Sequence, residues 1–522
     1  MLFNSFLFIF GFLPLSLVVF YGISRVSRRG GAVALSLLSL GFYAWWRPVY
    51  LWLLLGSIIF NYVVGGRIQR AWAAGQLGRV KVWLGFGLVA DLGLLGYFKY
   101  ANFFVENLSV LTGRDITLAR IALPLAISFF TFQKIAYLVD SARGEAKKTS
   151  FLEFTLFATF FPQLIAGPIV HYSEIIPQIR SSAFGRLSGQ NILVGLAIFA
   201  IGLFKKSVLA DTFGSYADPL YHLAQQGHAF DLSTAWIAAA TYTLQLYFDF
   251  SGYSDMAIGL ARMFGVLLPL NFHSPLRSPN IIDYWRRWHM TLQRFIVSYV
   301  FQPLSLPFNR WGARRGLRGW PFFAVGIAAP TFISFVLIGL WHGAGWTFIW
   351  FGIVHAIYVC VNEVWRQNRK DHNRKLRKQG LKPKQPTFAA TAAYHAITLF
   401  AVVFANVLFR ADSVWAAINL WRGMVGLTGL SVSSDYAAYH SAGLLLIVIL
   451  GAAIVAILPN TQQIMKLYRP AINWTEWRTI APALMPWTWR ATVPGLLFIG
   501  VVLFFGIEFI QRGQAVFLYF NF

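Results

Sequence analysis

Long apolar runs separated by short polar stretches dominate the chain. A transmembrane helix needs about 20 predominantly apolar residues, and runs near or somewhat below that length recur from one end of the sequence to the other. They occupy residues 2–22, 31–46, 50–65, 82–98, 120–139, 151–170, 190–209, 232–262, 288–304, 321–341, 346–364, 388–408, 441–458 and 492–510. The pattern predicts an all-α, polytopic integral membrane protein with about 11–14 apolar helical segments.

Two of these runs carry local signals of special geometry. The run at 151–170 ends in PQLIAGP, residues 162–168, where two prolines and a glycine break a helix. Broken backbone at membrane depth is tolerated only where protein or a water-filled cavity satisfies it. We therefore expect a re-entrant, funnel-lining segment there. The sequence WWRPVY, residues 45–50, is typical of an interfacial turn.

The composition agrees with a membrane protein and argues against a nucleic-acid partner. Hydrophobic residues make up 57% of the 522 residues and charged residues only 12%, whereas a soluble domain has roughly 25% charged residues. The net charge of +25 comes from basic residues placed in short stretches between apolar runs. That placement marks cytoplasmic loops. The single cysteine, Cys360, excludes disulfide frameworks and cysteine-based metal sites.

The distribution of basic residues also predicts the orientation. Arginines at 25–29, basic residues at 67–81 and nine Lys/Arg against one Asp at 366–384 should all be cytoplasmic, which places the N-terminus outside. The stretch 431–441 has no Lys or Arg and fits the outer side. We interpret residues 1–522 as a single domain in which 366–386 form a basic cytoplasmic linker.

The first cluster of buried ionisable residues lies at 244–265. Asp249, Asp255 and Arg262 interrupt an otherwise apolar stretch, and Asp249 shares a helix face with Tyr253. Charges inside apolar runs are expensive and usually pair. One interpretation is that the aspartates pair with arginines of 277–289 and hold the bundle together; the other is that they position a substrate or orient a catalytic imidazole.

The second cluster lies at 271–295. The sequence predicts one helix that begins near Asn280 or Asp283, with Arg286 and Arg287 pointing away from a side that carries aromatic residues and His289. A membrane-surface helix explains this pattern. A second explanation gives the arginines an anionic ligand such as a nucleotide phosphate.

The third cluster centres on His342, in WHGAGW. A lone histidine on an apolar face is often a hydrogen-bonded core residue. The small residues at 343–345, however, leave room for a substrate to approach a catalytic ring. His355 lies about 220° round a continuous helix from His342, so the two could share a reacting atom only if the helix breaks at the glycines.

Several common catalytic motifs are absent from the sequence. There is no GxSxG, no P-loop, no HExxH and no GxGxxG before a helix of a βαβ unit. Nucleophile-elbow hydrolases, nucleotide-driven pumps and zincins therefore have no support.

Six motifs, in order along the chain, resemble the membrane-bound O-acyltransferase (MBOAT) family. The bacterial branch is the more similar one, with its alginate O-acetyltransferases and the D-alanyl transfer protein of teichoic acid synthesis. The motifs are GYFKYANFF (96–104), LPLAISFFTFQKIAYLVDSARG (123–144), FPQLIAGPIV (161–170), LYFDFSGYSDMAIGL (246–260), YWRRWHMTL (284–292) and GLWHGAGW (339–346). The pair FR at 409–410 and the aromatic FLYFNF at 517–522 extend the match.

The resemblance implies a ring of transmembrane and re-entrant helices around a thin central waist, where a cytoplasmic acyl donor meets an acceptor reached from outside. The family's essential histidine corresponds to His342 and its second frequent histidine to His289, with His355 as a third family-like position. Relatives typically read like DYLYIPLGGNR where this chain has 298–316. We expect that segment to be a cytoplasmic loop or to set the choice of acceptor or partner.

The predicted function is an enzyme, an acetyl-CoA-dependent O-acyltransferase of the bacterial inner membrane. It would move acetyl across the bilayer toward a hydroxyl of an exported or cell-envelope polysaccharide, directly or through a periplasmic acyl-relay protein. A thioester is already activated, so no metal or other cofactor is expected. The catalytic candidates are His342 and His289, and the candidates for substrate or donor binding are Arg286, Arg287, Asp283, Trp341, Gln163, Tyr253 and Asp249. The alternatives are a transporter or flippase of an anionic glycan or lipid and a lipid-directed acyltransferase of the same family.

Overall fold

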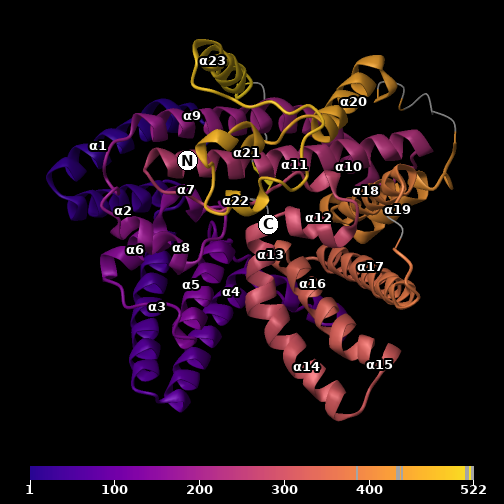
Figure 1. Cartoon of the computed structure of the whole chain (residues 1–522), viewed down its shortest axis with the longest axis horizontal. Helices are drawn as coiled ribbons and strands as arrows, with labels where there is room; N and C mark the ends of the chain where they lie inside the picture. Colours follow the sequence, from indigo (N-terminus) through magenta and orange to yellow (C-terminus); the bar gives the residue numbers. More distant parts are fainter. Residues whose placement is uncertain (384–385, 431–435, 437–438, 512–516, 519–522) are drawn as a thin grey trace.

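The computed structural model describes residues 1–383, 386–430, 436, 439–511 and 517–518, and every regular element within them is a helix. Figure 1 shows them arranged in a broad helical assembly. The all-α, polytopic prediction is confirmed. Seven helical stretches in the described residues are long and apolar enough to cross a membrane: Leu7–Val26, Val49–Ala73, Leu77–Thr112, Gly189–Gln225, Gly319–His342, Trp346–Lys378 and Phe388–Arg410.

The first half of the chain contains the helices that surround the re-entrant segment. They are η1 (Leu7–Phe12), α1 (Leu13–Val26), α2 (Arg28–Ala44), α3 (Val49–Ala73), α4 (Leu77–Thr112), α5 (Ile127–Ala142), α6 (Phe151–Thr159), α7 (Phe161–Leu164), α8 (Tyr172–Arg180), α9 (Gly189–Phe204), η2 (Lys205–Ala210), α10 (Asp211–Gln225) and α11 (Leu232–Met263).

The second half of the chain begins with short helices and continues with longer ones. They are η3 (Pro275–Arg277), α12 (Ile281–Arg287), α13 (Met290–Ile296), η4 (Val297–Phe301), α14 (Gln302–Arg314), α15 (Gly319–Phe323), η5 (Ala324–Ala328), α16 (Ala329–His342), α17 (Trp346–Lys378), α18 (Phe388–Arg410), α19 (Val414–Met424), α20 (Ala442–Ile457), α21 (Thr461–Ile464), η7 (Lys466–Tyr468), α22 (Trp474–Trp477) and α23 (Val493–Glu508).

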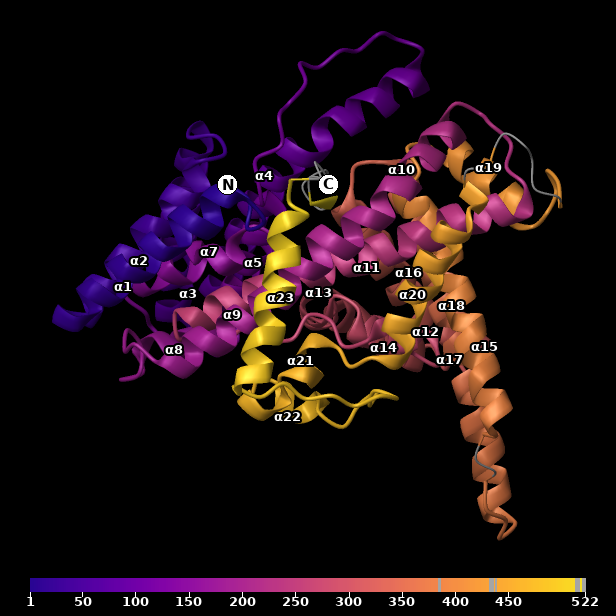
Figure 2. The ribbon, with the colours of Figure 1, turned by 90° about the horizontal axis from the view of Figure 1, so that it is seen from above.

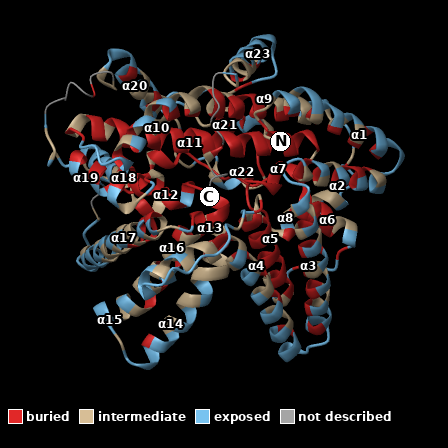
Figure 3. Ribbon diagram, turned by 180° about the vertical axis from the view of Figure 1, so that it is seen from behind, coloured by how far each residue is buried: buried red, intermediate tan, exposed pale blue. Residues whose placement is uncertain are grey.

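Helix α11 forms the centre of the molecule. Every residue from Thr241 to Met263 is buried, and Figure 3 shows the helix covered by its neighbours. It packs backbone to backbone on α9, since a Cβ added to Gly195 would lie 2.6 Å from the Gly259 carbonyl oxygen and one added to Gly202 would lie 2.6 Å from that of Gly252. Small residues that let helix backbones approach closely are a main means of helix association in membranes.

The break predicted in the run at 151–170 is present. Helix α6 ends at Thr159, α7 adds a single turn, and the chain then continues without regular structure to α8. All residues from Phe160 to Val170 are buried. The irregular backbone therefore lies inside protein, as the chemistry of the bilayer requires.

Three predictions about secondary structure are wrong in detail. The single helix expected near 280–294 is two helices, α12 and α13, separated at Trp288 and His289. The segment 298–316 is helical through Arg314, with η4 and α14, and is not a loop. The basic stretch expected to be a linker continues α17 as far as Lys378, because its residues are good helix formers. Residues 384–385 of that stretch, and 431–435 and 437–438 of the predicted outer loop, lie outside the described residues.

Two helix ends project from opposite faces of the molecule. Figure 2 shows the end of α4 and the chain that follows it on one side, and the basic end of α17 on the other. These two projections give the molecule two distinguishable sides.

Candidate active site

His342 is the last residue of α16, and the helix ends there because Gly343 is extended, with φ −170°. Gly345 is extended too, and α17 begins at Trp346. The break that His342 and His355 would need in order to approach each other is thus present. The room expected beside Gly343 is not: a Cβ there would clash with the ring of Phe348, so the glycine allows close packing of α16 against α17.

Aromatic rings enclose His342, which is only 2% exposed. The centroid of its ring lies 4.7 Å from that of Trp341 and 4.8 Å from that of Phe409, at steep angles in both cases. Phe409 belongs to the FR pair at the end of α18. The imidazole is therefore held in a dry setting by residues far apart in the sequence.

A cavity of about 70 Å³ reaches His342, and its lining includes neither Gly343 nor Phe348. Apart from His342 and Trp341, the polar residues that line it are Lys99 of α4 and Ser128 of α5. The remaining lining comes from Trp46, the residues 123–127 and 129 at the start of α5, and Ile165 and Ala166 of the re-entrant segment. The segment predicted to line a funnel does line this cavity.

His289 lies at the break between α12 and α13, with φ 42° in the left-handed region. Its Nδ1 is 3.0 Å from Oδ1 of Asn271, which also accepts a hydrogen bond of 2.8 Å from the hydroxyl of Thr291. The centroid of the His289 ring is 5.7 Å from that of Trp341. Trp341 thus contacts both catalytic candidates and joins them into one site.

His355, on α17, is the third histidine at this site. Its Nδ1 accepts a hydrogen bond of 3.2 Å from the indole N–H of Trp285, and Phe351 contacts the rings of both His355 and His342 at centroid distances of 4.5 and 6.2 Å. The hydrogen bond from Trp285 and the contact with Phe351 indicate that His355 has a supporting role at the site.

Asp249 and Asp255 do not pair with arginines of 277–289, contrary to one of the two interpretations of their sequence. Asp249 Oδ1 is 2.9 Å from Nζ of Lys206, which is also 2.5 Å from Oδ1 of Asp211. Asp255 is 2.8 Å from Nζ of Lys205. Both lysines lie where α9 passes into η2. The sequence pattern showed the buried charges but not their partners.

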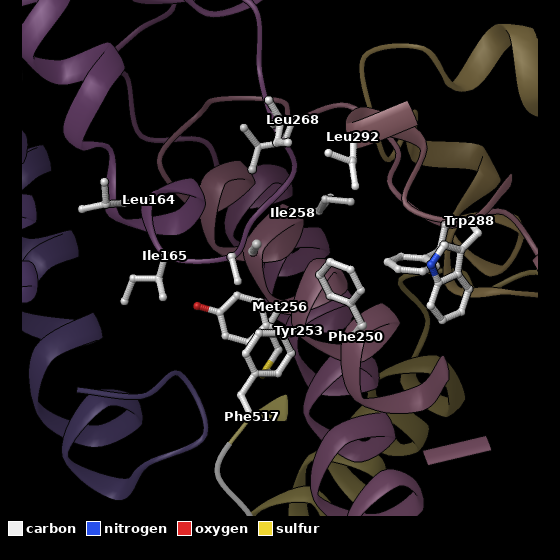
Figure 4. Packing of buried hydrophobic residues seen from close by; sticks show 14 of the residues in the cluster. Leu164, Ile165, Phe250, Tyr253, Met256, Ile258, Leu268, Trp288, Leu292 and Phe517 are labelled. Carbon is white, nitrogen blue, oxygen red and sulfur yellow. The ribbon is translucent and has the colours of Figure 1, made fainter. Parts of the chain in front are cut away.

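The remaining candidate residues do not line the cavity. Arg287 does not point away from the protein; it is buried and forms an ion pair of 2.5 Å with Asp283, whereas Arg286 is exposed. Gln163 donates a hydrogen bond of 2.7 Å to the Phe157 carbonyl and so braces the re-entrant segment. Tyr253 stacks on Phe517 at 4.2 Å, as Figure 4 shows, and does not line the cavity.

Sequence reasoning missed Lys99 and Asn271. Lys99 directly follows the apolar run 82–98, and an ionisable residue in such a place is by itself a signal of function in a membrane. The sequence motif at 96–104 contains Lys99 but did not single it out. Asn271 carries no comparable signal, because its role depends on the approach of α13 to the end of the α11 connection. The described residues contain no group of His, Cys, Asp and Glu arranged to hold a metal ion.

Comparison with known proteins gives consistent matches over most of the chain. A family model described as MBOAT, membrane-bound O-acyltransferase family, matches residues 32–402. A peptidoglycan O-acetyltransferase of Helicobacter pylori is 38% identical over 460 residues, covering 83% of this chain and 81% of that protein. A probable alginate O-acetylase AlgI of Pseudomonas aeruginosa is 34% identical, covering 84% and 80%. A teichoic acid D-alanyltransferase of Streptococcus thermophilus is 31% identical over 262 residues, covering 50% of this chain and 61% of its own.

Proposed function

Because the chain belongs to the membrane-bound O-acyltransferase family, we propose that it transfers acetyl from acetyl-CoA to a hydroxyl of an exported or cell-envelope polysaccharide, directly or through a periplasmic relay protein. The relatives act, by name, on peptidoglycan, alginate and teichoic acid. All three are polymers of the cell envelope or exterior, which favours a polysaccharide acceptor over a lipid one.

The observation that carries this proposal is the placement of His342 at a narrow cavity inside an aromatic enclosure. Acyl transfer from a thioester needs a base for the acceptor proton and a site that keeps water from the thioester. His342 is our general base. It takes the proton of the attacking hydroxyl and returns it to the departing thiolate.

His289 is the second residue of the proposed site, with a positioning role. Asn271 and Thr291 fix the orientation of its ring, and the ring packs against Trp341 next to the base. A rigid ring in this place can hold a reactant in line with His342, and such alignment supplies much of the rate of an enzymatic transfer.

The two substrates should approach from opposite sides of the membrane. The basic end of α17 and the face on which the chain after α4 emerges lie on opposite sides of the molecule (Figure 2). By the positive-inside rule, we assign the α17 side to the cytoplasm of the bacterial inner membrane and place the N-terminus outside. Residues 123–126 of the cavity then follow the outer connection and face the acceptor, while the exposed Arg286 remains available for donor phosphates.

The transporter alternative gave the buried Asp, His and Arg groups the role of a translocation or proton pathway. The aspartates of α11 instead have lysine partners at 2.8–2.9 Å. This pairing counts against a role for these aspartates in translocation.

The test is transfer of labelled acetyl from acetyl-CoA by the purified protein in proteoliposomes. Peptidoglycan fragments, an alginate oligosaccharide and a neutral glycan serve as acceptors, with His342→Ala as the matched inactive protein. We expect labelled product only with the wild type. If the wild type neither transfers nor hydrolyses the labelled acetyl group, the proposed donor is wrong.

A further inference from the structure

Lys99 is a buried cation that the proposed chemistry has not used. Its side chain lines the cavity with His342 and Trp341, and the residue is only 9% exposed. Its Nζ donates hydrogen bonds to the backbone carbonyl of Trp341 and, at 3.4 Å, to the hydroxyl of Ser128. No carboxylate among the described residues lies within ion-pairing distance of it.

A charged lysine without a counter-ion at membrane depth is costly, by several kcal/mol on insertion scales. Capping the end of α16 does not account for that cost. The hydroxyl of Tyr100, the next residue of α4, donates a hydrogen bond of 2.8 Å to the Leu340 carbonyl in the same last turn. A neutral donor is therefore sufficient for capping, and the charge at Lys99 has another use.

The start of α5 adds positive potential at the same cavity. Its N-cap residue, Ala126, has φ 60° and makes no side-chain capping bond, so the N-terminal end of this 16-residue helix is uncapped. Residues 126–129 line the cavity together with Trp341. The positive end of the helix macrodipole and the Lys99 ammonium thus face one small space, and no acidic residue lines it.

We propose that Lys99 is a catalytic residue that stabilises the negative charge formed on the acyl oxygen during transfer. The inference rests on the proposed function. As the acceptor oxygen bonds to the thioester carbon, His342 takes its proton and the carbonyl π pair moves onto oxygen beside Lys99. When the carbonyl re-forms, the carbon–sulfur bond breaks and the thiolate receives the proton from His342. The charge on oxygen exists only between these steps, so Lys99 binds the transition state more tightly than the substrate.

The first measurement is the steady-state kinetics of Lys99→Met against Tyr100→Phe. Loss of one oxyanion donor typically lowers kcat by about 10²–10³-fold, and we expect that loss for Lys99→Met with little change in KM for acetyl-CoA. Tyr100→Phe removes the neighbouring cap but no charge and does not touch the cavity, so it should keep near-normal kcat. Equal losses in the two variants would overturn the inference in favour of helix capping.

The second measurement separates charge recognition from structure. S-carboxymethyl-CoA carries a negative oxygen one carbon further from sulfur than the oxyanion of the intermediate, and S-acetonyl-CoA is a neutral counterpart of similar shape. We expect Lys99→Met to lose at least about tenfold of the wild-type ratio of affinities for the charged over the neutral analogue, while Tyr100→Phe keeps it. An unchanged ratio in Lys99→Met, in protein that still binds the neutral analogue, refutes the role of Lys99 alone. A wild type that binds neither analogue refutes the proposed donor, and the inference with it.

Discussion

Two groups of buried charged residues in this protein differ in the partners that they have. Around α11, Lys206 lies between Asp211 and Asp249, and Lys205 pairs with Asp255. At the cavity, Lys99 contacts a carbonyl, a hydroxyl and the ring of Trp341, and no carboxylate of the described residues forms an ion pair with it. Since both groups are shielded from water, the difference is not one of exposure. Charges that have counter-ions hold helices together, whereas Lys99, which has none at the cavity, serves the reaction that we propose.

The largest expected effect is at His342, on the cavity side of this comparison. His342→Ala should lower acetyl transfer by about 10²–10⁴-fold, the usual contribution of a general base, while the ion pairs of α11 keep the protein folded. Product formation in proteoliposomes and thermal unfolding of the same preparation check both parts. Near-normal turnover would show that the base lies elsewhere.

At Lys206, which pairs with an aspartate of α11, we expect a loss of stability and not of activity. Lys206→Met leaves two carboxylates buried without their cation, and removal of one partner of a buried pair typically costs 3–5 kcal/mol. Stability should therefore fall while activity per folded molecule stays close to normal. Lys205→Met is the matched control, because Asp255 keeps hydrogen bonds of 2.6 and 2.7 Å from Thr461 and Gln462. The comparison fails if the two lysine variants lose equal stability.

His289→Ala should have a smaller effect on catalysis than loss of the base. Misplacement of a reactant by about 1 Å can cost up to 10²-fold in rate, and we expect a loss of about 10-fold or more in kcat/KM with the fold intact. Single-turnover kinetics distinguish slower chemistry from weaker binding. A variant that is only unstable would make His289 part of the structural group.

Charge reversal at Arg286 tests an exposed cation against these buried ones. Arg286→Glu should raise the KM for acetyl-CoA by a few-fold, and the increase should shrink in high salt because exposed charges are screened. An unchanged KM would leave Arg286 as an anchor at the membrane surface.

The smallest effect is expected at an ion pair in contact with water. Arg180 donates hydrogen bonds of 2.7 and 3.0 Å to Glu153, which lower the pKa of Glu153 from 4.5 to about 2. A lowered pKa contributes stability above pH 4.5, and this stability is lost as the pH falls from about 4.5 toward 2. Glu153→Gln should cost about 0.5–1 kcal/mol at pH 7, with less difference from the wild type near pH 3. Thermal unfolding at both pH values measures this, and a difference independent of pH would contradict the assignment.

The sequence predicted the helical fold and the two central histidines, but not how distant residues meet. The apolar runs matched the helices because hydrophobic length is a local property, and the break at 162–168 was marked by proline and glycine. The termination of α12 at Arg287 was not marked, since Trp288 and His289 leave the helix only through tertiary contacts such as those with Phe272 and Asn271. The helices α8, α10 and α19 were missed because they are short or contain proline or polar residues.

Partners of buried charges were the least predictable feature. Lys205 and Lys206 stand near the end of the apolar run 190–209, and nothing local in the sequence marks them as partners of the aspartates. Arg277 and Arg287 were the nearer candidates in sequence, but the close approach of α9 to α11 decides which cation reaches each aspartate.

The glycine contact between α9 and α11 also has a consequence for biosynthesis. The two helices are complete once residue 263 has been made, before His289 and His342 exist in the chain. Domains generally fold from the N-terminus during synthesis, and membrane helices insert first and associate afterwards. We therefore expect the scaffold of the enzyme to assemble at the translocon without activity, and the later helices then to add His289 and His342.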